Sequence, residues 1–233
     1  MIIDEVLAQA KKENRSVLTE IEAKQILAEA GINCTDTRLA PTKEKASAIS
    51  EEIGYPVVLK VSSVDITHKS DAGGVKVNLK NKEEVENAFD EIMASCKKVQ
   101  PNADIEGISV QGMAKPGLEI IMGMIKDDNF GPVVMFGLGG VYVEVLKDVV
   151  FRFAPLTHQE AQDMIQEIKS YKVLQGVRGE KPRDVYALVD TLVKISRMAS
   201  EWESVVDQLD INPLVVLPNQ QGVKVLDALI IKR

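Results

Sequence analysis

The stretch Tyr55–Val77, YPVVLKVSSVDITHKSDAGGVKV, decides the fold because it joins an apolar strand pattern to a polar segment that ends in two glycines. Alternate residues from Val57 to Val61 form one face of a predicted strand, which leaves Val58 and Lys60 together on the other face. An apolar group beside an ammonium suits a nucleotide, because lysine binds phosphate as a compact point charge. The alternative is an edge strand whose lysine turns to water.

The polar segment that follows carries one of the two histidines in the chain. His68 lies between Asp65 and Asp71, and Gly73 and Gly74 follow directly. A neutral imidazole is a possible covalent nucleophile, and neighbouring carboxylates could orient it. The glycines would let the backbone move and approach phosphate oxygens closely. The alternative for His68 is an ordinary surface residue.

Composition excludes several function classes. The chain has 233 residues, 28 of them basic and 35 acidic, so its formal charge is 28 − 35 = −7, which argues against nucleic acid as a partner. Glycines and Glu144 interrupt the longest apolar run, Val133–Leu146, so we expect no membrane association. The N-terminus lacks the pattern of a signal peptide. Cys34 and Cys96 show neither zinc-ligand nor disulfide spacing, which favours a reduced, cytoplasmic protein.

Helix and strand patterns alternate along the chain and predict an α+β protein with two packed lobes. Helices are expected over 2–13, 19–31, 42–53 and 81–99, from a capping box at Thr157 and Glu160, and from a first-turn proline, Pro182, to 200. Strands are expected over 37–40, 57–61, 75–79, 105–113, 118–125, 132–136, 142–153, 205–217 and 223–231.

The last two strands form a predicted hairpin that gathers three oxygen-bearing side chains. Asp210 and Asn212 face the same side of one strand, and a turn centred at 219–220 places Asp227 across from Asn212. Facing carboxylates repel, so Mg²⁺ bound partly by phosphates would suit this patch. The alternative is that Asp210 and Asn212 organise a turn at Pro213 while Asp227 is solvated.

The glycine motifs exclude two common nucleotide-binding fingerprints. The GLGG at Gly137–Gly140 lacks the last glycine of GxGxxG, and no GxxxxGK[ST] occurs in the chain. A nucleotide site would therefore have to be built in another way.

Several of these segments together resemble one family. They are THKSDAGGV at Thr67–Val75, the preceding VVLKV, the GLGG, DINPL at Asp210–Leu214 and LDA at Leu226–Ala228. With these segments together in this order, the chain is similar to the ATP-grasp subunit of ADP-forming acyl-CoA synthetases. More specifically, the chain resembles the β subunit of ADP-forming acetyl-CoA synthetase (acetate:CoA ligase), a relative of succinyl-CoA synthetase. The resemblance runs from about Val17 to the C-terminus.

The resemblance implies an ATP-grasp fold, in which two lobes hold Mg²⁺ and ATP or ADP between them. We expect an N-terminal helix over 1–16, a small lobe with the His68 loop over 17–110, and a large lobe with the metal site over 111–233.

The resemblance also implies roles for individual residues. Lys60 would contact phosphates, beside Val58. Asp210, the first of the three metal residues, takes the place of a more usual glutamate. The backbone of Val110, Gln111, Gly112 and Met113 would form the hinge against adenine, Asp210, Asn212 and Asp227 would hold Mg²⁺, and Glu119 and Arg152 would lie near the nucleotide. Alternatively, Glu119 pairs across a sheet and Arg152 is an ordinary surface residue.

The implied reaction is acyl-CoA + ADP + phosphate ⇌ acid + CoA + ATP, with acyl chemistry in a separate CoA-binding α subunit of an α2β2 heterotetramer. His68 would shuttle the phosphoryl group between that subunit and the nucleotide. The alternative is a nucleotide-sensing regulatory ATP-grasp module without phosphotransfer. A ligase acting alone on two small substrates is disfavoured, since no second-substrate pocket can be assigned.

Overall fold

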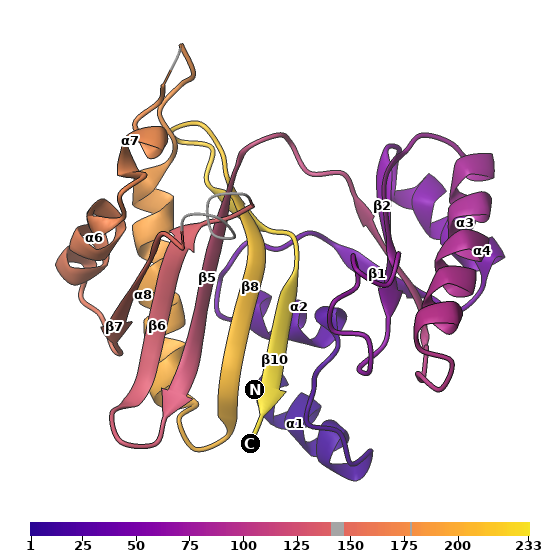
Figure 1. Ribbon diagram of the computed structural model, residues 1–233, viewed down its shortest axis with the longest axis horizontal. Coiled ribbons are helices and arrows are strands. Elements are labelled where there is room, and N and C mark those ends of the chain that lie inside the picture. The colour runs from indigo at the N-terminus through magenta and orange to yellow at the C-terminus, as the bar shows by residue number, and fades with distance from the viewer. Residues whose placement is uncertain (141–146, 178) are drawn as a thin grey trace. The chain divides into compact units, whose positions relative to one another are not determined.

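The computed structural model describes residues 1–140, 147–177 and 179–233, which fold into two compact units (Figure 1). The large unit consists of Met1–Leu18, Glu22–Cys34 and Lys115–Arg233. The small unit consists of Thr19–Ile21 and Thr35–Ala114. Each unit combines helices with an antiparallel sheet, so the predicted α+β class is confirmed.

The small unit has a four-stranded sheet in the order β1-β4-β2-β3, with two helices against one face. Its elements are β1 (Thr37–Ala40), α3 (Lys43–Ile53), β2 (Val57–Ser62), β3 (Val75–Leu79), α4 (Lys82–Val99) and β4 (Gly107–Gly112). Both helices begin at predicted caps: Thr42 accepts a hydrogen bond from the Lys45 N–H, and Asn81 accepts one from the Glu84 N–H. In Figure 1 these helices lie side by side beyond β1 and β2.

The large unit has a six-stranded sheet within the described residues, in the order β10-β8-β5-β6-β7 with β9 paired to β8. Its strands are β5 (Leu118–Asp127), β6 (Gly131–Leu138), β7 (Val149–Phe153), β8 (Val206–Val216), β9 (Val223–Val225) and β10 (Ala228–Lys232). Its helices are α1 (Ile2–Lys12), α2 (Glu20–Glu29, whose first two residues belong to the small unit), α6 (His158–Glu167), α7 (Tyr171–Leu174) and α8 (Val185–Glu201). Helices α6 and α8 cover one face of this sheet (Figure 1).

Two predictions near the end of the chain have opposite outcomes. The capping box at Thr157 and Glu160 is present and opens α6, so that prediction is confirmed. The prediction that Pro182 begins the last helix is wrong. Helix α8 begins at Val185, because the side chain of Asp184 accepts a hydrogen bond from the Ala187 N–H and so supplies the cap. The first residues of the strand expected over 142–153 lie outside the described residues.

The division into units differs from the expected lobes. The expected boundary between 110 and 111 is close to the observed one between Ala114 and Lys115. However, most of the first 34 residues belong to the large unit. The reason is burial, since Leu18, Ile26 and Leu27 of this segment join the core that the large sheet makes with α6 and α8. No helix in the described ranges combines the length and the apolar character needed to cross a membrane.

Candidate functional site

Strand β2 presents a partly polar wall on the face opposite the core of the small unit. Leu59 and Val61 pack into that core, and the alternate residues Val58 and Lys60 face away from it. Strand β2 is internal to the sheet, between β4 and β3, and Lys60 is 6% exposed. The alternative of an edge strand with a solvated lysine is therefore wrong.

Strand β4 extends this wall with hydrogen-bonded polar side chains. Gln111 lies opposite Val58, and Ser109 lies opposite Lys60. The Gln111 Oε1 atom accepts hydrogen bonds from the hydroxyls of Thr35, at 2.8 Å, and Thr37, at 3.0 Å. These contacts fix the orientation of the Gln111 amide.

The carboxylate of Glu20, which the sequence did not reveal, contacts Lys60 on this wall. The Glu20 Oε1 atom lies 2.8 Å from the Lys60 Nζ, and its Oε2 lies 3.4 Å from the Lys69 Nζ. The side chains of Glu20 and Lys60 are 4% and 7% exposed. We call these three side chains the Glu20 cluster. No local signal points to Glu20, because 40 residues separate it from Lys60 in the chain.

His68 is exposed, but the residues on either side of its segment are held in the core. Ile66 and Ala72 are 3% and 5% exposed and belong to the small unit's core. We call the exposed stretch between them, residues 67–71, the His68 segment. The Asp65 carboxylate accepts a hydrogen bond from the Asp104 N–H at 2.8 Å, so it is engaged upstream of the segment. The two ends of the segment are thus packed, whereas the residues between them, apart from the half-buried Lys69, are exposed.

The diglycine serves close packing in this structure. A Cβ on Gly74 would lie 2.6 Å from the Val61 Cγ1 and 2.9 Å from the Lys69 backbone oxygen. The Gly74 carbonyl accepts a hydrogen bond from the Val61 N–H at 2.8 Å. Gly73 has a φ of +67°, which glycine adopts without strain. These contacts explain both glycines structurally, and their contact with phosphates stays a prediction.

The predicted hinge lies where the chain leaves the small unit. Val110 and Gln111 pair with both neighbouring strands, β1 and β2, and Gly112 is opposite Val57. The Met113 N–H donates to the Pro56 carbonyl at 2.9 Å, and the Met113 side chain is 46% exposed. The chain passes into the large unit two residues later. This position is compatible with the hinge role, which stays a prediction.

The predicted hairpin register is confirmed in the large unit. Ile211 of β8 lies opposite Ala228 of β10, and Leu214 lies opposite Val225 of β9, in one continuous antiparallel register. In that register Asn212 faces Asp227, and the Asn212 N–H donates to the Asp227 carbonyl at 3.2 Å.

Asp210 and Asn212 both lie inside β8, which continues through Pro213 to Val216. The alternative that they organise a turn at Pro213 is therefore wrong. Asp227 is half-buried in the break between β9 and β10, so it is not the fully solvated residue of that alternative.

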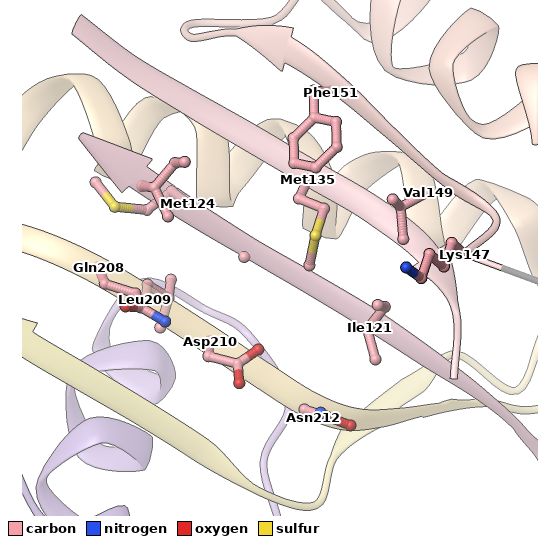
Figure 2. A pocket seen from close by; sticks show the side chains of 12 residues that line it. Ile121, Met124, Met135, Lys147, Val149, Phe151, Gln208, Leu209, Asp210 and Asn212 are labelled. Atoms are coloured by element: carbon pink, nitrogen blue, oxygen red, sulfur yellow. The ribbon is translucent and has the colours of Figure 1, made fainter. Parts of the chain in front are cut away.

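A pocket of about 460 Å³ opens on the face of the large sheet where Asp210 and Asn212 project (Figure 2). Its lining comes from β5, β6, β7 and β8 and is largely apolar, with Ile121, Met124, Met135, Val149 and Phe151 among the side chains shown. Gly123 pairs with Asp210, and a Cβ there would lie 2.5 Å from the Leu209 backbone oxygen. A glycine is thus required where the strand beside Asp210 comes close.

Lys147 also lines this pocket, and the sequence reasoning missed it. Its φ is +47°. The next residue, Asp148, is buried and accepts hydrogen bonds from the backbone N–H groups of Lys169, at 2.9 Å, and Ser170, at 2.8 Å, and from the Ser170 hydroxyl. Burial alone raises the pKa of the Asp148 carboxyl, but these hydrogen bonds outweigh burial and lower it below 3.8. Asp148 therefore fixes the backbone that presents Lys147.

The two remaining predicted residues lie in different surroundings. Glu119 is near the GLGG segment: its carbonyl accepts a hydrogen bond from the Gly139 N–H at 2.8 Å, and a Cβ on Gly140 would lie 3.4 Å from its Oε2. Arg152 instead forms an ion pair with Glu167 of α6 and donates to the Phe151 carbonyl. The structure thus does not bring Arg152 to the pocket, and this ion pair agrees with the surface alternative.

Comparison with known proteins identifies the family of this chain. The model of the ATP-grasp domain family matches residues 9–231. The chain is 44% identical over 230 residues to the β subunit of acetate–CoA ligase [ADP-forming] II from Pyrococcus furiosus, covering 99% of this chain and 96% of the relative. This chain belongs to the ATP-grasp family, among the β subunits of ADP-forming acetate–CoA ligases.

Solved structures of this ATP-grasp family show the same fold. A Candidatus Korarchaeum cryptofilum acetyl-coenzyme A synthetase 1, in complex with coenzyme A and Ca-AMPCP, matches with a TM-score of 0.94 and 49% identity, covering 98% of this chain and 99% of that chain. Another structure of that synthetase, with Mg-AMPPCP, has its phosphohistidine segment pointing towards the nucleotide binding site. It matches with a TM-score of 0.84 and 45% identity over the same shares of the two chains.

The oxygen atoms of Asp210 and Asn212 in this pocket would suit a hard divalent cation. Asp210 offers a carboxylate and Asn212 an amide oxygen, both on the pocket side of β8. Hard cations such as Mg²⁺ take oxygen ligands and retain sites for water or phosphate. Asp227 lies opposite Asn212 in the hairpin register but is not among the residues that line this pocket, so its part in holding the cation stays a prediction.

Proposed function

We propose that this chain is the nucleotide-handling β subunit of an ADP-forming acetate–CoA ligase and that it transfers a phosphoryl group between ATP or ADP and His68. One observation supports this most directly. His68 lies on an exposed segment whose next residue, Lys69, shares the Glu20 carboxylate with Lys60. A possible nucleophile and a phosphate-binding cation are thus connected within one unit. The exposed position of His68 suits a residue that must be reached both by a phosphoryl donor and by a phosphoryl acceptor.

The reaction of the complete enzyme is acyl-CoA + ADP + phosphate ⇌ acid + CoA + ATP. The name of the P. furiosus relative, a β subunit, supports a separate CoA-binding α subunit here. We propose that two copies of each subunit form an α2β2 heterotetramer in the cytoplasm.

Phosphoryl transfer through His68 takes two balanced steps. In the first, an imidazole nitrogen bonds to phosphorus as the bond from phosphorus to its donor in the α subunit breaks. In the second, a terminal oxygen of ADP bonds to that phosphorus as the nitrogen–phosphorus bond breaks, which yields ATP and regenerates the imidazole. A histidine suits both steps because its phosphorylated form transfers readily in either direction.

The chain's other residues bind and orient the nucleotide. Lys60 would contact its phosphates, and the main chain from Gly112 onward would meet the base, because Val110 and Gln111 are committed to both neighbouring strands. Asp210, Asn212 and Asp227 would hold Mg²⁺. When bound, Mg²⁺ reduces the repulsion between the phosphoryl group and the anionic nucleotide. Such positioning and charge stabilisation account for most catalysis of phosphoryl transfer.

The test is to incubate the purified chain with Mg²⁺ and γ-labelled ATP, with and without its α partner. We expect acid-labile, base-stable protein phosphate in the wild type and none in His68→Ala. The matched control is His158→Ala, because His158 is the other histidine and is also exposed, at the start of α6. Equal label in wild type and His68→Ala would overturn the shuttle role.

The alternative, a nucleotide-sensing module without phosphotransfer, would give a different result in the same experiment. Mg-nucleotide would raise the melting temperature of the chain, but His68 would stay unlabelled even with the α partner present. The presence of Lys60, His68 and Asp210 together favours phosphotransfer over sensing.

A further inference from the structure

The Glu20 cluster connects the nucleotide-binding wall to the His68 segment. We propose that Glu20 is a positioning residue that holds the His68 segment beside Lys60, and that it does so through the ammonium of Lys69. The kinetic consequence of this proposal rests on the proposed function, whereas its structural consequence does not.

In the Glu20 cluster, each carboxylate oxygen of Glu20 contacts a different lysine. The Oε1 atom lies 2.8 Å from the Lys60 Nζ, and the Oε2 atom lies 3.4 Å from the Lys69 Nζ. Glu20 thus accepts a hydrogen bond from Lys60 of strand β2 and forms an ion pair with Lys69 of the segment. Lys69 is also held through its main chain, because its carbonyl accepts a hydrogen bond from the Gly74 N–H at 2.7 Å. His68 is the residue directly before Lys69, so a contact that holds Lys69 restrains the backbone next to His68.

Burial makes these contacts stronger than ordinary surface ion pairs. The side chains are 4% exposed for Glu20, 7% for Lys60 and 16% for Lys69. Charges shielded from water are screened little by salt and interact more strongly than solvated ones. The small unit also holds a solvated pair for comparison, Lys76 with Glu91, with exposures of 39% and 60%. Exposed pairs of that kind contribute little.

The core residues at the two ends of the His68 segment define the part of the chain that the Glu20 cluster would hold in place. Ile66 and Ala72 stay packed in the small unit's core, so residues 67–71 are the part that can leave the wall. Lys69 is at the centre of these five residues. Because the Lys69 side chain is central, its contact with the Glu20 carboxylate can hold or release the whole segment.

Hydrogen–deuterium exchange tests the structural consequence on the full chain. The amides of Ala72, Gly73 and Gly74 donate back to His68, Ser70 and Lys69, so they report opening of the segment. We expect Glu20→Gln and Lys69→Gln to speed their exchange about tenfold or more, because each variant removes one charge of an ion pair that is shielded from water. Lys69→Arg should restore slow exchange. The matched control, Lys76→Gln, should change nothing.

Two results would overturn the proposal. One is unchanged exchange at these amides in both Glu20→Gln and Lys69→Gln. The other is a uniform increase across the small unit, including the amides of α4, because that would show a general loss of stability. If Glu20→Gln fails to fold, Lys69→Gln decides alone, since its side chain is the most exposed of the three.

The kinetic consequence separates positioning from nucleotide binding. We expect Lys69→Gln to lower the rate of His68 phosphorylation at saturating ATP about tenfold while the KM for ATP stays within about twofold. An unchanged rate alongside faster exchange would overturn the positioning role. If the wild type takes no label with its α partner, the proposed function fails while the exchange result still decides whether Glu20 holds the segment.

Discussion

The two groups of site residues differ most in what surrounds their charges. In the small unit, Lys60 is 6% exposed and ion-paired to a carboxylate that is itself buried. In the large unit, Asp210 is half-buried and Asn212 exposed, and both line a pocket whose other walls are mainly apolar. Removing the charge of Lys60 leaves the buried Glu20 carboxylate without this partner. Removing the charge of Asp210 instead changes mainly the side chains that contact a bound ligand. Stability and activity should therefore respond differently in the two units.

The largest expected effect comes from comparing Lys60→Met with Asp210→Asn. Loss of the Lys60 ammonium removes one partner of a buried pair, which costs about 3–5 kcal/mol and lowers the unfolding midpoint by on the order of 10 °C. Asp210→Asn should move the midpoint by only about 1–2 °C but lower ATP synthesis about 10²- to 10³-fold. Scanning fluorimetry measures the unfolding midpoint of each variant, and a coupled assay with the α partner measures its ATP synthesis. Equal loss of stability in the two variants would contradict the contrast.

Alternation and strand pairing explain why the faces of the site strands and the register of the hairpin are predictable from the sequence. The alternation of the strand around Lys60 assigns Val58 and Lys60 to one face, and the structure agrees. The hairpin register follows from its central turn and places Asn212 opposite Asp227 as expected. Both predictions depend on neighbours in sequence or on a two-strand pairing, where geometry leaves little freedom.

Contacts between distant segments explain what the sequence could not reveal. Glu20 meets Lys60 across 40 residues, and no local pattern marks a carboxylate as the partner of a particular lysine. Ile26 and Leu27 look like residues of any short helix, so their packing in the large unit became visible only in the core itself. Pro182 is a signal for a first helical turn, but the side-chain cap of Asp184, two residues further along the chain, determined where the helix begins.

Asp148 gives an intermediate effect that depends on pH. Its pKa is lowered in the folded chain, so its stabilising contribution is present above the ordinary value of 3.8 and is lost as the pH falls through the folded pKa. At pH 7, Asp148→Asn should cost about 1–3 kcal/mol, since the amide keeps only one acceptor oxygen. Unfolding midpoints of wild type and variant should converge below about pH 4.

The control for that pH profile is Asp128→Asn, because the Asp128 side chain is 89% exposed. Its midpoint should follow the wild type at every pH. A constant difference between wild type and Asp148→Asn from pH 3 to pH 8 would show that shape, not charge, explains the loss.

Lys147→Gln should give the smallest effect and should sharpen the comparison most. Lys147 is exposed and lines the pocket with Asp210, so its ammonium can meet a phosphate without being tied to stability. We expect the KM for ADP to rise about threefold to tenfold with the unfolding midpoint unchanged, and Lys147→Arg to restore most of the affinity. Lys172→Gln, on exposed Lys172 of α7, is the matched control. If Lys147→Gln and Lys172→Gln raise the KM for ADP equally, the increase comes from the general surface charge. Lys147 then has no specific part in binding the nucleotide.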